Sequence, residues 1–266
     1  MHSGSTTALC LNKFWQGKHQ NHTPTPKQRK IYGHFMACAD YARQQRKGKR
    51  LIVVHDGDAI DGLHHGTQQV FTMNTEEQTE IHEDLMDTFL RRAKFNRKEG
   101  DKLFYVSGTE VHTGDSEDKI GKSMRSQKTE DGLYAFDHLE VEVNGRLVWF
   151  VHHGPKLGKG ANEGNMMRNW LRDIYWTSQK YKTRPPDLVV TGHVHTPGYN
   201  TYVMDFHVVH GLILPSWQAK TRYGYMVAPT ERNEIGAAFV EIKADGEIRV
   251  PFILKQETAS RERVSV

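Results

Sequence analysis

Four short apolar runs, each followed at once by a side chain that can bind a metal, constrain this fold more than any other feature of the chain. The runs cover residues 51–54, 103–106, 147–151 and 188–190. Their length and continuous apolar character are typical of strands buried in the middle of a sheet. Because amphipathic stretches alternate with them, the sequence predicts the α/β class.

The stretches between these runs predict helices and turns. Thr25 and Gln28 form a capping-box pattern around Pro26, so a first helix is expected to begin there. A second is expected near Thr75, with Gln78 as its box partner, and a third over 167–181. Asn144-Gly145 predicts a hairpin between strands at 139–143 and 147–151. Further strands are expected near 208–214, 235–242 and 247–253.

The length and composition favour one domain. A chain of 266 residues can bury one core, and no composition break divides it. We expect a single domain over 1–254 and a polar tail over 255–266. No apolar run approaches the ~20 residues of a membrane span, and the first residues lack the pattern of a signal peptide. The two cysteines, Cys10 and Cys38, suit reduced thiols, so the sequence predicts a cytoplasmic protein without membrane contact.

The polar residues at the four strand ends have a coherent chemistry. They include Asp58, Glu110, His152 and the pair His193 and His195. Sites in open α/β sheets form beyond the carboxyl ends of the strands, so these side chains are expected at one edge. Imidazole and carboxylate ligands suit Mn²⁺, Fe or Zn²⁺. Because a carboxylate can bridge two ions, the pattern predicts phosphate-ester hydrolysis by a two-metal site.

Three motifs carry a family resemblance. GDAIDG at 57–62 matches GDxxD, GHVH at 192–195 matches GHxH, and His152 stands where a strand-end ligand is expected. In these the chain resembles the calcineurin-like metallophosphoesterases. GTEVH at 108–112 and Pro-Ser-Trp-Gln at 215–218 extend the resemblance to the phage- and prophage-encoded phosphoesterases. The resemblance implies an αββα four-layer sandwich with two metals at one edge.

The resemblance also implies roles. Asp58 would bridge the ions, His152 and His193 would bind one, His195 would bind the other, and Asp61 would orient a neighbouring ligand. The family's GNH(D/E) asparagine is Thr109 here, so we expect Glu110 as the oxygen ligand and His112 as the general acid. His112 as a surface histidine, Glu110 as a solvated acid, and His153 in place of His152 remain alternatives.

The start of the chain departs most from the family. Those proteins open with a strand and an Asp-x-His motif, of which His2 resembles the histidine, so its aspartate would precede Met1. We expect a start at an internal methionine, without the first strand, and His2 as a ligand of the ion that His195 binds. The alternative is that His2 is a disordered terminal residue.

The charge distribution bears on the substrate. Residues 13–50 hold ten Lys/Arg and one acid, and 155–184 hold seven and two, within a net charge of +4. Such stretches suit DNA or RNA, although solvated helix faces look the same. The prediction is a phosphoesterase with two divalent ions, Mn²⁺ first, acting on a phosphate ester such as a nucleic acid. Protein phosphatase and nucleotide hydrolase activities stay open. A degenerate scaffold of the same fold, with little or no catalysis, is the alternative function.

Overall fold

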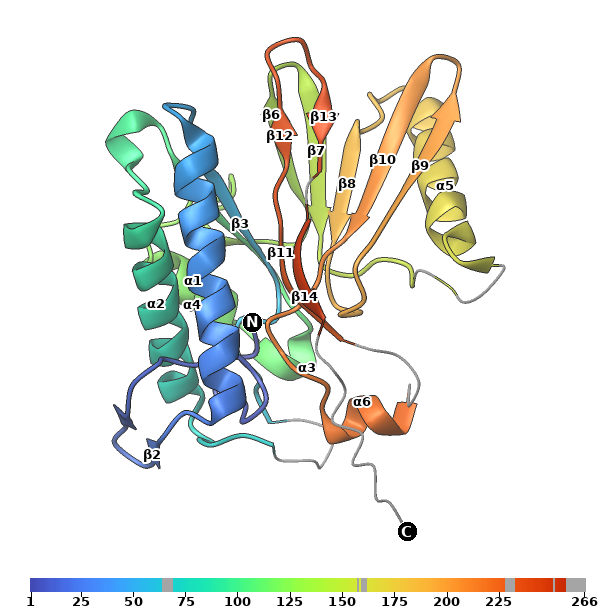
Figure 1. Cartoon of the computed structure of the whole chain (residues 1–266). Coiled ribbons are helices and arrows are strands. Elements are labelled where there is room, and N and C mark those ends of the chain that lie inside the picture. Colours follow the sequence, from blue (N-terminus) through green and yellow to red (C-terminus); the bar gives the residue numbers. More distant parts are fainter. Residues whose placement is uncertain (64–68, 157, 159–161, 228–232, 251, 257–266) are drawn as a thin grey trace.

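The computed structural model describes residues 1–63, 69–156, 158, 162–227, 233–250 and 252–256, with only the backbone of His112 and of 252–256. It shows a mixed α/β fold in which two sheets pack face to face between helices (Figure 1). The predicted α/β class with four layers is confirmed.

The first sheet is short and parallel. It holds β3 (Ile52–Asp56), β4 (Lys102–Val106) and β5 (Ala135–Phe136), in that order. Its outer face packs on α1 (Pro26–Arg46), α2 (Thr75–Arg92) and α4 (Ser116–Ser123). Leu103 and Tyr105 of β4 enter this core, because alternate side chains of a strand point to one face.

The second sheet has the order β6-β7-β8-β10-β9. Its strands are β6 (Leu139–Val143), β7 (Arg146–Val151), β8 (Leu188–Thr191), β9 (Gly198–Met204) and β10 (His207–Ile213). The three central strands are parallel, and the two edge strands are antiparallel to their neighbours. Helix α5 (Asn165–Tyr181) covers its outer face through Met167, Leu171 and Tyr175.

Apolar side chains from both sheets fill the space between them. Phe104 and Val106, on the inner face of β4, pack with Leu139 and with the partly buried Phe150. The carboxyl ends of β3, β4, β7 and β8 therefore lie close together, at the lower edge of the sheets in Figure 1. This packing joins the two halves of the candidate site.

Shorter elements complete the described part. They are β1 (Trp15–Gln16), β2 (Asn21–His22), η1 (Arg97–Glu99), α3 (Glu110–Thr113), α6 (Arg222–Val227), β11 (Glu234–Ala238), β12 (Glu241–Ile242), β13 (Ile248–Arg249) and β14 (Phe252–Gln256). Strand β14 includes the first two residues of the expected tail, and 257–266 lie outside the described residues. None of the described helices is both long and apolar enough to cross a membrane.

Most expected elements are present, with one wrong cap. The capping box of Thr25 and Gln28 is confirmed. The box at Thr75 is wrong, because Asn74 is the N-cap residue and accepts from the amides of Glu76 and Glu77. The side chain of Gln78 is instead buried and bonds to backbone groups elsewhere.

Residues 1–11, before β1, are mostly buried without forming a strand. Ser3 and Ser5 make isolated bridges to Ile60 and Val70, and Leu9 joins the main core. His2 is only 4% exposed, so its side chain is part of the packed structure. The alternative of a disordered His2 is therefore wrong.

Candidate metal centre

Two groups of side chains at the strand ends have the spacing of metal ligands. The three-histidine cluster consists of His152, His153 and His193. The His2 cluster consists of His2, Asp58 and His195. Within each cluster the ligand atoms lie within 4.8 Å of one another. The edge thus brings together five of the six predicted ligands and adds His153, which the sequence offered only as a rival to His152.

Asp58 connects the two clusters. Its Oδ2 lies 3.0 Å from His152 Nε2 and 3.8 Å from His193 Nδ1, on the side of the three-histidine cluster. The same oxygen lies 3.8 Å from His2 Nε2 on the other side. A carboxylate between two groups of imidazoles has the arrangement of a bridging ligand.

The backbone at these positions is unusual. His2, Asp58, His193 and His195 all have positive φ, between 49° and 64°. Non-glycine residues adopt this region at a cost, and such residues gather at functional sites. The strained backbone turns the four side chains toward the same edge, an orientation that regular strands ending there would not give.

Two glycines allow close packing around the ligands. A Cβ on Gly57, whose φ is 71°, would lie 2.3 Å from His152 Nδ1. A Cβ on Gly108 would lie 2.3 Å from the amide nitrogen of Asp58. Any side chain at either position would displace a candidate ligand, so the chemistry of the site requires glycine there.

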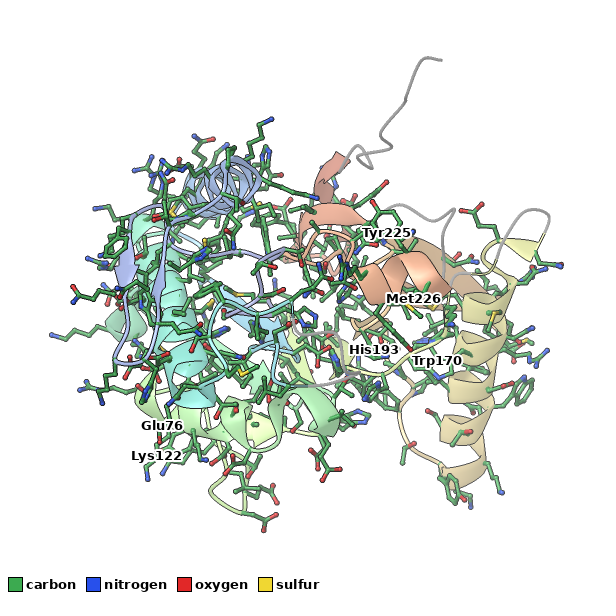
Figure 2. All side chains as sticks on the ribbon, turned by 90° about the horizontal axis from the view of Figure 1, so that it is seen from below. Glu76, Lys122, Trp170, His193, Tyr225 and Met226 are labelled. Carbon is green, nitrogen blue, oxygen red and sulfur yellow. The ribbon has the colours of Figure 1, made fainter. Side chains whose placement is uncertain are left out.

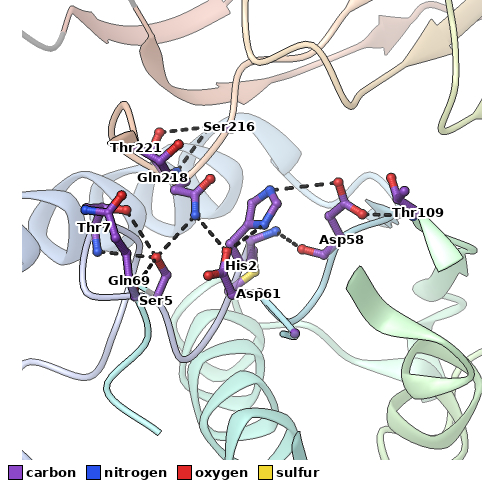
Figure 3. Close-up of polar contacts among 12 residues, drawn as sticks. His2, Ser5, Thr7, Asp58, Asp61, Gln69, Thr109, Ser216, Gln218 and Thr221 are labelled. Atoms are coloured by element: carbon purple, nitrogen blue, oxygen red, sulfur yellow. Dashed lines mark hydrogen bonds and ion pairs between the residues drawn. The ribbon is translucent and has the colours of Figure 1, made fainter. Parts of the chain in front are cut away.

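Hydrogen bonds orient the imidazoles. His152 Nδ1 lies 2.8 Å from the carbonyl oxygen of Asp56, which can only accept, so Nδ1 carries a proton and Nε2 is directed toward Asp58. His2 Nδ1 lies 3.2 Å from Asp61 Oδ1 (Figure 3). His2 Nε2 lies 3.0 Å from His195 Nε2. Asp61 thus lies beside His2, and the orienting role that the resemblance implied for it stays a prediction.

Burial and neighbouring groups shift the pKa values of the candidate ligands. Burial opposes ionisation of Asp58, but hydrogen bonds from His152 and His193 outweigh it and hold the pKa of Asp58 well below its usual range. Burial and the nearby His2 lower the pKa of His195 well below its usual value, so this imidazole is neutral. An ionised carboxylate and a neutral imidazole are the forms that bind a cation.

Of the residues that replace the GNH(D/E) motif, one contacts the candidate ligands and another is exposed to solvent. The Thr109 amide donates to Asp58 Oδ1 over 2.9 Å, and its hydroxyl lies 3.2 Å from His193 Nδ1. Glu110 is exposed at the start of α3 and belongs to neither cluster. The side chain of His112, the expected general acid, lies outside the described part of the chain. Among the described side chains of this segment, Thr109 is the one that reaches the candidate ligands.

Glu117 is a supporting residue that no sequence pattern singles out. It belongs to α4, is 2% exposed, and its Oε1 accepts from the amide of Ala59 over 2.9 Å. Burial raises the pKa of its carboxyl. By holding the backbone just after Asp58, it fixes the direction in which that ligand points. Only the tertiary structure shows this role, because Glu117 lies 58 residues from its partner.

A pocket of about 250 Å³ adjoins the three-histidine cluster. Its lining residues are Ser107, Gly108, Asp137, Val151, His152 and His153. The donor set fits divalent ions, since imidazole nitrogens and one ionised carboxylate converge without a cysteine. A small substrate group in the pocket would lie against His152 and His153.

Comparisons with known proteins give no family assignment. No family model matches the chain, and no curated protein matches it. Solved structures that resemble it include a Thermotoga maritima protein determined by NMR (TM-score 0.33, 13% identity, covering 78% of this chain and 99% of that one). Another is an uncharacterised Streptococcus pneumoniae protein described as a predicted phosphoesterase (TM-score 0.34, 15% identity, covering 77% of this chain and 97% of that one). A third is Entamoeba histolytica Vps29 complexed with zinc (TM-score 0.35, 9% identity, covering 76% of this chain and 98% of that one).

These scores are low, so the residues and their geometry carry the functional conclusion. The resemblance to phage-encoded members stays a prediction, as do the cytoplasmic location and the ligand assignments.

Proposed function

We propose that this chain is a metal-dependent phosphoesterase that hydrolyses phosphate esters at a two-ion site. The observation that carries the proposal is the position of Asp58 Oδ2 between the three-histidine cluster and the His2 cluster. Two bound divalent ions would supply the positive charge that activates water and stabilises a phosphoryl group in its transition state. Mn²⁺ is the first candidate, with Fe and Zn²⁺ as alternatives.

The side chains divide the work between them. His152, His153 and His193 would hold one ion, His2 and His195 would hold the other, and Asp58 would contact both. The pocket beside His153 would admit the phosphate ester. The hydroxyl of Thr109, close to both His152 and His193, can donate a hydrogen bond to a phosphoryl oxygen.

For the substrate, we propose a nucleic acid. Arg168 and Arg172 are exposed on α5, the helix that covers the second sheet. Figure 2 shows Trp170 of the same helix, His193, and Tyr225 and Met226 of α6 in the same part of the view from below, and Figure 1 shows that α6 lies lower than α5. Trp170 is partly buried, Tyr225 is 38% exposed and Met226 is 76% exposed. Basic and aromatic side chains together suit a phosphate backbone and its bases.

The activity is tested with purified protein and a bis-aryl phosphodiester. We expect hydrolysis with Mn²⁺, loss of hydrolysis on chelation, and recovery when Mn²⁺ is restored. Asp58→Asn should lower turnover by at least about 1000-fold, because the bridging carboxylate is removed. Asp87→Asn is the matched control, since Asp87 is an exposed acid on α2 paired only with Arg91 in the described structure.

The outcomes separate two functions. Turnover that requires both Mn²⁺ and Asp58 supports the phosphoesterase. Binding of Mn²⁺ without turnover of any phosphate ester, with Fe²⁺ and Zn²⁺ also inactive, contradicts it and supports the degenerate scaffold. Thr109 in place of asparagine is the feature that favours this second function.

The substrate class is tested through salt dependence. We expect the double variant Arg168→Ala and Arg172→Ala to bind DNA more weakly and with a flatter dependence on salt, because fewer phosphate contacts release fewer counterions. Arg91→Ala, on α2 at the opposite side of the molecule (Figure 1), is the control. A salt slope equal to that of the wild type contradicts a nucleic-acid role for α5.

A further inference from the structure

We infer that Gln218 is a positioning residue that sets His2 as a metal ligand, acting through Asp61. The inference rests on the metal centre of the proposed function and assigns it a residue from the late Pro-x-Trp-Gln stretch. Gln218 lies 157 residues from Asp61 in the chain, and nothing in the GDxxD or GHxH motifs points to it.

A continuous set of polar contacts connects the three side chains (Figure 3). Gln218 Nε2 donates to Asp61 Oδ1 over 2.8 Å and to Ser5 Oγ over 3.2 Å. The same Asp61 oxygen lies 3.2 Å from His2 Nδ1. Gln218 is 4% exposed, Asp61 is 6% exposed and His2 is 4% exposed, so water competes little with these contacts.

The chemistry of the contacts fixes their direction. Asp61 Oδ1 accepts from the side-chain nitrogen of Gln218, and its 3.2 Å ion-pair distance to His2 Nδ1 favours a proton on that nitrogen, although this pair lacks hydrogen-bond alignment in the described structure. The other nitrogen of His2, Nε2, is then left with its lone pair toward His195 and Asp58. A carboxylate that holds the far side of a metal-binding imidazole fixes its tautomer and its orientation.

Gln218 itself is held rigidly. The backbone amide nitrogen of Gln218 donates to Ser216 Oγ over 3.1 Å. The neighbouring Trp217 packs edge-on against Phe35 of α1, with ring centroids 5.1 Å apart. The backbone amides of Leu9 and Ala219 bond between this segment and the segment that begins with His2. Gln218 can therefore hold Asp61 in one place, which a side chain on a loose loop could not do.

A purely structural role predicts a different result from a positioning role. If Gln218 only packs the N-terminal segment, its loss lowers stability and leaves the ions bound as before. If it positions His2, its loss selectively weakens the ion of the His2 cluster. The three-histidine cluster shares no described contact with Gln218 and serves as the internal reference.

The experiment counts Mn²⁺ by equilibrium dialysis and records the EPR spectrum of the loaded protein. The wild type is expected to bind two ions and to show the spectrum of a coupled pair. Gln218→Met keeps the length of the side chain but removes the donor. It should weaken the second ion by about 10- to 100-fold, the usual effect of losing such a partner, and leave the six-line spectrum of a single ion.

Two further variants sharpen the result. Gln218→Glu has nearly the same shape but sets an acceptor against Asp61, so it should weaken the second ion at least as much. Gln28→Met is the matched control, because Gln28 is a buried glutamine that bonds to the backbone of Ser5 and has no described contact with Asp61. It should keep both ions.

The readings distinguish this inference from the proposed function. Two ions in Gln218→Met with unchanged affinity overturn it, as does a wild type that binds a single ion. A wild type that binds two ions without turnover, with the second lost in Gln218→Met, refutes the phosphoesterase and supports the positioning role. If Gln218→Met fails to melt cooperatively, Gln218→Asn, whose shorter amide cannot reach Asp61, takes its place with the same two readings.

Discussion

At the residue scale, the carboxyl group of Asp56 stands out because it is buried beside the candidate metal centre without a hydrogen-bond partner in the described structure. Neither of its oxygens has a hydrogen-bond partner among the described residues. Burial raises the pKa of Asp56 from 3.8 to about 7. A Cβ on Gly192 would lie 2.8 Å from Asp56 Oδ2, so this carboxyl fills space where the ends of β3 and β8 meet. It costs stability in the ion-free protein.

We predict that Asp56→Asn stabilises the chelated protein in a pH-dependent manner. A raised folded-state pKa means that the folded state binds the proton more tightly, so stability is full below pH ~4 and is lost as pH rises to about 7. Asparagine carries no charge and escapes this loss. The gain should reach at most about 4 kcal/mol at pH 8 and vanish near pH 4.

Urea unfolding of the chelated proteins at pH 4, 6 and 8 measures the effect. Asp87→Asn, on the exposed face of α2, should show no comparable trend. A gain from Asp56→Asn that is the same at all three pH values would contradict the pKa explanation.

The sequence predicts the ligands that follow strands better than the residues that support them. Asp58, His152, His193 and His195 could be grouped because parallel strands deliver their last residues to one edge. Gln218 and Glu117 could not, because each comes from a distant segment and acts through contacts that only packing creates. Glu110 was chosen for its chemistry, yet the first turn of α3 leaves it exposed.

At the scale of elements, local chemistry explains what the sequence predicts. The box at Thr25, the turn at Asn144-Gly145 and the apolar period of α5 are local signals, and each gives the expected element. Strand β9 begins at Gly198, before the first of the late strands that the sequence predicts near 208–214. The mixed composition of β9 does not predict a strand at its start. Every residue of β9 pairs with β10, and this pairing extends the strand to Gly198.

Helix α1 supports the site from a distance, and its cap is testable. The Thr25 hydroxyl accepts from the amide of Gln28, whose side chain returns to the amide of Thr25 and also bonds to the carbonyl of Ser5. We predict that Thr25→Ala lowers the free energy of unfolding by about 1 kcal/mol, the usual effect of losing an N-cap. Urea unfolding measures it.

The same variant should still bind two Mn²⁺ ions, because Thr25 contacts no candidate ligand in the described structure. Ser123→Ala, at the last residue of α4, is a control for the loss of a helix-end hydroxyl that caps no N-terminus. A loss of one ion in Thr25→Ala would mean that the cap holds His2 in place, contrary to the prediction.

At the scale of the whole molecule, the candidate metal centre lies where the two sheets meet. Asp58 follows β3 of the first sheet, whereas His152, His193 and His195 follow β7 and β8 of the second. Between the sheets, Phe104 and Leu139 provide apolar contact. Ions held by ligands from both sides would add a second, polar link at the lower edge in Figure 1.

We therefore predict that Mn²⁺ raises the melting temperature of the protein. A ligand that binds only the folded state stabilises it by about 2.7 kcal/mol at 100 times its Kd. For a chain of 266 residues, that corresponds to several degrees. Asp58→Asn should lose most of this increase because it leaves each cluster without its shared carboxylate, whereas Asp87→Asn should keep it. Calorimetry over a series of Mn²⁺ concentrations measures the shift, and a melting temperature independent of Mn²⁺ would refute a metal link between the sheets.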